Sequence, residues 1–238
     1  EYKQDYSEDA DSLLDNHHLN GKPALQYKDF SVWQKEYLQG EALQQKIEFW
    51  RSALHDFPHQ LNLPDLPHMA AISSLQRLTQ TIMISDATTE KVRQYCGENA
   101  SSPFMYYLAA YSLLVSRFSQ SAKLTIGVPT AGRDLLETED IVGLFVNGVV
   151  IPITVDETTT VKDYLNSCKD LSLQSFSNQD VPLDVLAESL GIDRSSGKSN
   201  GKLPGSQIGF NYQDFQLGEE FNWDNLSELI DGTEVAPI

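Results

Sequence analysis

The segment GVPTAGRDLLETEDIVGLFVNGVV, from Gly127 to Val150, connects two apolar runs through a polar turn. The runs are KLTIGVPT at 123–130 and GLFVNGVVIPITV at 143–155, and their β-branched residues predict two strands. Between them, Arg133 follows an Ala-Gly pair and precedes an acidic linker, while Asn147 is an amide embedded in the second run. A folded core accounts for the apolar runs, but the arginine and the asparagine need a separate explanation.

Composition limits the classes of protein that this chain can belong to. Its 238 residues are 40% hydrophobic and 10% aromatic, which is enough to bury a substantial core. The net charge is -17, and no run of basic residues exists to neutralise phosphates, so we expect no nucleic-acid partner. No apolar stretch approaches the roughly 20 residues that span a bilayer, and no signal peptide opens the chain. We expect a soluble protein without a membrane partner.

Cysteine usage suggests where the protein resides, and the start of the chain suggests that it is a fragment. Cys96 and Cys168 both lie in segments predicted to be helical, with neither metal-ligand spacing nor a disulfide framework. These features favour the reducing cytoplasm and predict no metal site. The first residues lack an initiator methionine and begin in a polar acidic lead-in, so we expect an excised fragment.

Helical and strand-like patterns alternate along the rest of the chain. A proline-rich linker at 58–68 predicts a boundary, because proline fixes φ and lacks an N–H. Beyond about residue 70, strands interleave with helices without an internal repeat, which predicts a mixed α/β domain. The expected helices are 26–39, 41–57, 87–99, 103–118, 160–176 and 182–190, and the expected strands are 77–85, 123–130, 143–155 and 206–215.

Apolar spacing also predicts which helical residues are buried. The helix at 103–118, capped by Ser102 and opened by Pro103, should bury one stripe or its immediate neighbours: Tyr107, Leu108, Tyr111 and Leu114. The helix at 160–176 should bury another stripe: Val161, Leu165, Cys168 and Leu171. Its start carries Thr160 and Asp163 as a capping pair.

The chain offers little catalytic chemistry. Its five histidines all precede the α/β part, so a Ser-His-Asp or Cys-His arrangement would need a histidine from the lead-in or the linker. GVPTAG matches neither nucleotide-binding glycine spacing. Arg133 either caps or pairs with nearby acids, or it forms a buried ion pair or channel wall. Asn147 is either an edge residue in water or a buried amide that needs partners, and spacing alone favours neither interpretation.

Several motifs together resemble the condensation domains of nonribosomal peptide synthetases. YLAAYSLLVSRFSQSAKLTIGVPTAGR, IVGLFVNGVV and NQDVPLDVLAESL occur in the family's order, QYKDFSVWQ resembles the segment after its catalytic motif, and SQIGFNYQDF resembles its late strand. The resemblance implies two chloramphenicol-acetyltransferase-like lobes around a tunnel, each with a mixed sheet and flanking helices. Residues 1–69 would be the acidic lead-in and connecting helices, and 70–238 the second, C-terminal lobe, incomplete at its C-terminal end.

The resemblance also implies a reaction and its partners. Such a domain joins a donor acyl or peptidyl thioester to the amine of an acceptor aminoacyl thioester. Both substrates ride on phosphopantetheine arms of peptidyl and aminoacyl carrier proteins, so no cofactor would be bound directly. The family's HHxxxDG motif belongs to the first lobe, which would be a further partner. The paired His17 and His18 here read HHLNGKP, without the required aspartate and glycine, so we expect no catalytic residue in this chain and no activity from it alone.

Residues that match the family's motifs become candidates for the tunnel wall or its structural support: Gly132, Arg133, Phe145, Asn147 and Asp180. By the resemblance, Arg133 would pair with the aspartate of HHxxxDG, and Asn147 would orient a substrate carbonyl or the pantetheine amide. The chain departs from the family at Asn178, Gly148 and Pro152, where members often carry histidine, threonine and arginine.

Two other functions and one surface property complete the expectations. The fold could be a catalytically silent docking module for carrier or tailoring proteins, or an epimerization domain, although Phe145-Val146-Asn147 disfavours the latter. A face that includes Phe145, Val149 and the segment after Pro182 would lie against the missing lobe. We therefore expect self-association through that face, or its coverage by the chain's own N-terminal helices.

Overall fold

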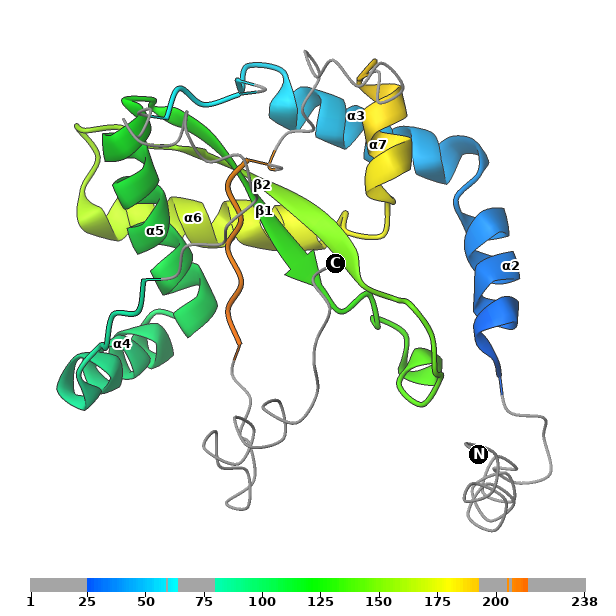
Figure 1. Cartoon of the computed structure of the whole chain (residues 1–238), viewed down its shortest axis with the longest axis horizontal. Helices are drawn as coiled ribbons and strands as arrows, with labels where there is room; N and C mark the ends of the chain where they lie inside the picture. The colour runs from blue at the N-terminus through cyan, green and yellow to red at the C-terminus, as the bar shows by residue number, and fades with distance from the viewer. Residues whose placement is uncertain (1–24, 59, 64–79, 193–204, 206, 214–238) are drawn as a thin grey trace, which may run out of the picture.

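A computed structural model describes residues 25–58, 60–63, 80–192, 205 and 207–213. In this part of the chain, helices surround a short twisted sheet (Figure 1). The helices are α2 (Tyr27–Tyr37), α3 (Gly40–Leu54), α4 (Asp86–Glu98), α5 (Pro103–Ser119), α6 (Val161–Phe176) and α7 (Leu183–Ser189), with a 3₁₀ turn η3 (Leu136–Thr138). The strands are β1 (Lys123–Thr130) and β2 (Asn147–Thr154).

The sheet combines antiparallel and parallel pairing. β1 and β2 pair antiparallel, from Lys123 opposite Thr154 to Thr130 opposite Asn147. On the other edge of β1, Gly127 forms a parallel bridge with Gly209, because its N–H donates to the carbonyl of Ile208 at 2.9 Å. This mixed sheet with flanking helices confirms the predicted α/β class.

The core forms where α5 and α6 pack against this sheet. Leu124 and Ile126 of β1 and Ile151 and Ile153 of β2 are fully buried, as is Leu108 of α5. The residues that start the two helices also follow the prediction. The hydroxyls of Ser102 and Thr160 accept from backbone N–H groups in the first turns of α5 and α6. The core therefore holds β2, and with it Asn147, in a fixed place.

The predicted burial stripe holds on α5 through its neighbours and is partly wrong on α6. On α5, Leu114 is 53% exposed, and Val115 beside it and Ser112 beside Tyr111 face the core. On α6, Val161 is 73% exposed, and the buried face comprises Tyr164, Cys168, Ser172 and Ser175. The Tyr164 and Ser112 hydroxyls bond at 2.6 Å across the two helices. Polar residues with internal partners thus occupy positions that a purely apolar stripe could not predict.

Three predicted strands differ from the structure. Residues 80–85 lie outside any strand, and Ile82 is 80% exposed, because no strand in the described part of the chain pairs with them. The segment 143–146 precedes β2 as irregular backbone, since pairing with β1 begins at Asn147. Within the predicted strand 206–215, the described residues 207–213 contribute only the bridge at Gly209.

Two helices, α2 and α3, precede the rest of the described fold, as predicted. α3 buries Trp50 and Leu54 against the core, whereas α2 buries no residue. The expected boundary at residues 69 and 70 and the acidic lead-in before residue 25 lie outside the described residues. In the parts of the chain that are described, no helix combines the length and apolarity needed to cross a membrane.

Candidate functional site

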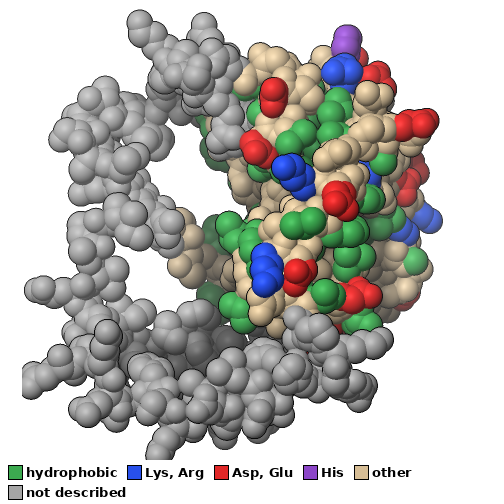
Figure 2. Space-filling model, turned by 90° about the vertical axis from the view of Figure 1, so that its right-hand side faces the viewer, with side chains coloured by type: hydrophobic (Ala, Val, Ile, Leu, Met, Phe, Trp, Pro, Cys, Tyr) green, Lys and Arg blue, Asp and Glu red, His purple; other side chains and the backbone are tan. Residues whose placement is uncertain are grey.

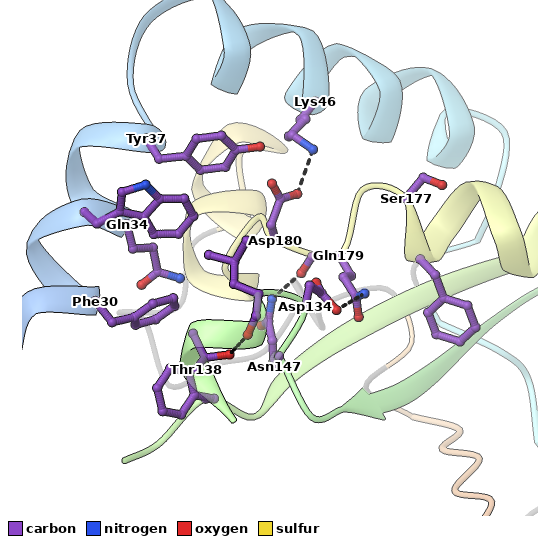
Figure 3. Close-up of a pocket in the computed structure, with 15 residues that line it drawn as sticks. Phe30, Gln34, Tyr37, Lys46, Asp134, Thr138, Asn147, Ser177, Gln179 and Asp180 are labelled. Carbon is purple, nitrogen blue, oxygen red and sulfur yellow. Dashed lines mark hydrogen bonds and ion pairs between the residues drawn. The ribbon is translucent and has the colours of Figure 1, made fainter. Parts of the chain in front are cut away.

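A half-open cavity of about 450 Å³ lies between α2, the segment that links β1 to β2, and the turn before α7 (Figure 3). Four of the five residues predicted for the tunnel wall line it, and Arg133 lies beside it. The lining residues are Phe30, Trp33, Gln34, Tyr37, Lys46, Gly132, Asp134, Leu135, Thr138, Phe145, Asn147, Phe176, Ser177, Gln179 and Asp180.

Asn147 fastens the turn before α7 to the start of β2. Its Nδ2 donates to the backbone carbonyls of Gln179 at 2.6 Å and Val181 at 3.1 Å, and its Oδ1 accepts from the Gly148 N–H at 2.9 Å. Both amide protons are therefore used within the protein. Of the two interpretations of Asn147, the geometry matches the partly buried amide with partners, and only Oδ1 retains capacity for a ligand.

The turn at 177–181 is anchored by several elements. The Trp50 indole N–H of α3 donates to the Asn178 carbonyl at 3.1 Å, and the Gln179 Nε2 donates to Asp134 Oδ1 at 3.0 Å. Lys46 Nζ of α3 lies 2.8 Å from Asp180 Oδ1. Together with Asn147, these contacts make the turn the rigid floor of the cavity.

Asp180 also faces the wall of the cavity that α2 forms. The interaction of its carboxylate with the Tyr37 hydroxyl raises the pKa of that hydroxyl. The side chains of Lys46 and Asp180 are only 20% and 28% exposed, so solvent screens their ion pair less than a surface pair. Figure 3 shows Tyr37, Lys46 and Asp180 pointing toward one another from α2, α3 and the turn. Asp180 thus joins three elements at one end of the cavity.

Arg133 stabilises the polar turn after β1. Its Nη1 donates to the backbone carbonyl of Thr138 and, at 3.3 Å, to that of Glu139. Its guanidinium lies over the Phe145 ring, 4.2 Å from the centroid. Among the described residues, no carboxylate pairs with Arg133, so the local partners are carbonyls rather than the neighbouring acidic side chains.

Gly132 permits a close backbone approach that no other residue would allow. Its φ is +65°, a left-handed conformation that favours glycine. A Cβ at this position would lie 1.9 Å from the carbonyl oxygen of Phe145. Gly132 therefore holds the segment of Arg133 against the segment of Phe145.

The face predicted to meet the missing lobe is covered within this chain at Phe145 and Val149. Phe145 is 6% exposed and Val149 is 2% exposed. The Phe145 ring packs against Tyr27 and Phe30, with centroids 5.3 Å and 4.7 Å away. Coverage by an N-terminal helix, the alternative expectation, thus holds for Phe145. Leu186, in the segment after Pro182, is buried as well.

The sequence interpretation missed part of the cavity. Trp33, Tyr37, Lys46 and Gln179 line it but were not candidates. Trp33 and Tyr37 recur with Tyr27 and Phe30 at helical spacing, which puts them on one face of α2, but spacing does not show what that face meets. For Lys46 and Gln179, no sequence signal was available, since their partners are distant in the chain.

The lining of the cavity is mixed, with polar and aromatic side chains side by side. Its lining contains aromatic rings, amides, carboxylates and one ammonium, without histidine or cysteine. No cluster of metal-binding side chains occurs among the described residues. On the side of the molecule that carries α2, single basic side chains lie between acidic and hydrophobic ones (Figure 2). The fold and site define a mixed α/β protein with a partly open cavity.

Comparison with known proteins places this chain in a family. The family model for the condensation domain matches residues 10–229, so the chain belongs to the condensation domain family. Gramicidin S synthase 2 from Aneurinibacillus migulanus is 31% identical over 175 residues, which cover 74% of this chain and 4% of that protein. Tyrocidine synthase 3 from Brevibacillus parabrevis is 30% identical over 178 residues, covering 74% of this chain and 3% of that protein.

Solved structures confirm the fold. A four-domain nonribosomal peptide synthetase bound to AMP and glycine superposes with a TM-score of 0.68 at 19% identity, over 95% of this chain and 16% of that one. The X-domain from teicoplanin biosynthesis superposes with a TM-score of 0.65 at 21% identity, over 79% of this chain and 42% of that one. The chain thus spans a small part of its synthetase relatives and less than half of this single domain.

Proposed function

We propose that this chain is the second lobe and connecting segment of a peptide-bond-forming condensation domain. Residues 1–69 would connect the lobes, and 70–238 would form the second lobe. The complete domain would transfer a donor acyl or peptidyl group from its thioester to the amine of an aminoacyl thioester. Both would be presented on phosphopantetheine arms by carrier proteins. The family match over residues 10–229 carries this proposal.

Within that reaction, the chain would supply binding and support rather than proton transfer. The amine attacks the thioester carbonyl, the carbon–sulfur bond breaks, and the pantetheine thiol leaves. No HHxxxDG occurs in the 238 residues, so the general base would come from the other lobe. The cavity beside Asn147 would form part of the wall along which an arm lies.

Arg133 and Asn147 would have different roles in this wall. Only Nη1 of Arg133 donates to described residues, so the rest of its guanidinium is available to a carboxylate. We propose that this part of the guanidinium pairs with the aspartate of HHxxxDG on the other lobe. Asn147 has both N–H groups engaged, which favours contact of Oδ1 with a pantetheine amide N–H over contact with a substrate carbonyl.

Surface exposure supports a partner on the β1–β2 segment. Leu136, Val142, Leu144 and Val146 are 77%, 92%, 75% and 63% exposed. These apolar side chains flank Arg133 and Asn147 in sequence and would meet the other lobe, or a second copy of this chain when that lobe is absent. Sedimentation should detect such self-association, and a strict monomer that binds no hydrophobic dye would contradict it.

The test is dipeptide formation between two loaded carrier proteins. The chain alone should give no product above uncatalysed aminolysis, whereas joining it to a lobe that carries HHxxxDG should give turnover. In the joined domain, Arg133→Ala should lower turnover, and Arg117→Ala should not, because Arg117 forms only an exposed pair with Glu157. Product from the chain alone would refute its assignment as one lobe. Unchanged turnover with Arg133→Ala would refute the role of Arg133.

A docking module is the second candidate. It is favoured by the likeness to the X-domain in its complex with OxyB, at a TM-score of 0.67. In that case the joined domain would bind a tailoring enzyme yet form no dipeptide.

A further inference from the structure

α2 forms one wall of the cavity but is weakly integrated into the fold. Phe30, Trp33, Gln34 and Tyr37 line the cavity, yet no residue of α2 is buried. α3, the next helix, buries Trp50 in the core. Figure 1 shows α2 at one end of the molecule, beyond α3 and away from the sheet. Elements with few buried apolar contacts open at the lowest free-energy cost.

A small number of contacts fasten α2 over the cavity. The Tyr27 hydroxyl donates to the Leu144 carbonyl at 2.9 Å, and Phe30 packs on Phe145. The Tyr27 ring also lies directly over Gly143. A Cβ added to Gly143 would stand 2.3 Å from Tyr27 Cδ2, so only glycine accommodates the ring there. These contacts all reach the short segment 143–145, and at the other end of α2, next to the link to α3, Tyr37 faces Asp180.

The link between α2 and α3 has the features of a hinge. α2 ends at Tyr37 and α3 begins at Gly40, with Leu38 and Gln39 between them. Gly40 has φ +65°, and no atom lies within 4 Å of where its Cβ would be. No neighbouring atom packs at this position of Gly40, and glycine tolerates the change in backbone dihedrals that a hinge requires.

We propose that α2 is a hinged lid that turns about residues 38–40 and controls entry of a pantetheine arm into the cavity. The identity of the ligand rests on the proposed function, whereas the motion of α2 does not. When α2 is released from 143–145, the cavity loses its aromatic wall and opens to solvent. The same release removes the contacts of α2 with the Phe145 ring, on which Arg133 stacks. Opening of the lid therefore also affects Arg133, the residue proposed to pair with the other lobe.

Hydrogen exchange of the 238-residue chain tests the motion. A released helix of 11 residues is marginal in water and loses amide protection, so exchange reports undocking. Residues 27–37 should exchange at least about tenfold faster than 40–54. Gly143→Ala should speed exchange in 27–37 by about tenfold more and leave 40–54 unchanged.

Gly97→Ala is the matched control, because Gly97 is exposed and no atom lies within 4 Å of its Cβ position. It should leave exchange in α2 unchanged. Should Gly143→Ala fail to fold, Tyr27→Phe removes only the hydroxyl that bonds Leu144 and should speed exchange in α2 moderately. Equal protection of 27–37 and 40–54, unaffected by these substitutions, would overturn the lid.

A reversible lock tests access. The Cβ position of Gly143 lies 3.0 Å from Tyr27 Cβ, so Tyr27→Cys with Gly143→Cys can form a disulfide after a small shift. The natural thiols, Cys96 and Cys168, are buried and should not compete. Binding of S-methyl pantetheine, followed by saturation-transfer NMR, should be at least about tenfold weaker in the oxidised form than in the reduced form.

Equal binding in both forms would overturn the role of α2 in entry. Absence of binding in both forms, with exchange showing release of α2, would overturn the pantetheine assignment and leave the lid supported. The two failures are therefore distinguishable.

Discussion

Gly132 should be the least replaceable glycine at the cavity, and three glycines allow the reasons to be separated. Gly191 also has a positive φ, +72°, but no atom lies within 4 Å of its Cβ position. Gly191→Ala should therefore cost only the left-handed conformation, about 1–2 kcal/mol. Gly132→Ala carries that cost and also places a methyl group 1.9 Å from the Phe145 carbonyl oxygen.

The overlap with a backbone atom cannot be relieved by a rotamer change, so the segments of Gly132 and Phe145 must separate. Overpacking typically costs about 1–3 kcal/mol, which brings the expected loss for Gly132→Ala to about 2–5 kcal/mol. Gly97→Ala, in an exposed helical position, should instead stabilise by about 0.5–1 kcal/mol.

Urea unfolding measures all three variants, provided that the slope with denaturant stays constant. The midpoint should fall strongly for Gly132→Ala, moderately for Gly191→Ala, and rise for Gly97→Ala. If Gly132→Ala and Gly191→Ala lower the free energy of unfolding equally, the close approach to Phe145 does not contribute to the cost, and this explanation of Gly132 is wrong.

Other substitutions follow from the same contacts. Asn147→Asp should lower the free energy of unfolding by about 2–3 kcal/mol at pH 7, because a carboxylate would face two backbone carbonyls. Part of this stability should be recovered at pH 4, where the carboxylate is protonated. Equal losses at both pH values would contradict this. Arg133→Ala should lower the free energy of unfolding by about 1–2 kcal/mol, against less than about 0.5 kcal/mol for Arg117→Ala, both by urea unfolding. Burial raises the pKa of Cys168 from 9.0 to about 11, so its contribution to stability is complete below pH 9 and is lost as pH rises toward 11. Cys168→Ala should weaken this alkaline loss of stability, measured as unfolding midpoints across that range.

Local sequence patterns predicted the elements that need no specific distant partner, only a core to pack against. β1, β2 and the helices appear near their expected bounds, because β-branched runs and apolar spacing report burial against any core. The run at 80–85 has the same composition but lies outside a strand. A strand requires a second strand to bond its backbone, and composition does not report whether that partner is present.

The candidate site was predicted only as a set of positions. Family motifs selected Gly132, Phe145 and Asn147, and all three line the cavity. Their contacts depend on distant segments, such as the carbonyls of Gln179 and Val181 that bind Asn147. Hydrogen bonds between residues more than thirty positions apart leave no periodic pattern in the sequence. The sequence therefore could not predict that Asn147 holds the turn before α7.

The two sides of the cavity are held by different kinds of interaction, and this difference has a kinetic consequence. The floor, the turn at 177–181, is fixed by hydrogen bonds from Asn147 and Trp50 and by an ion pair with Lys46. The lid is held mainly by aromatic contacts of α2, which tolerate sliding and reorientation. Substitutions in the floor should therefore change stability and cavity shape together. Changes at the contacts of Tyr27 should alter the rates of ligand entry and release while the floor, and the geometry it imposes on a bound arm, stays intact.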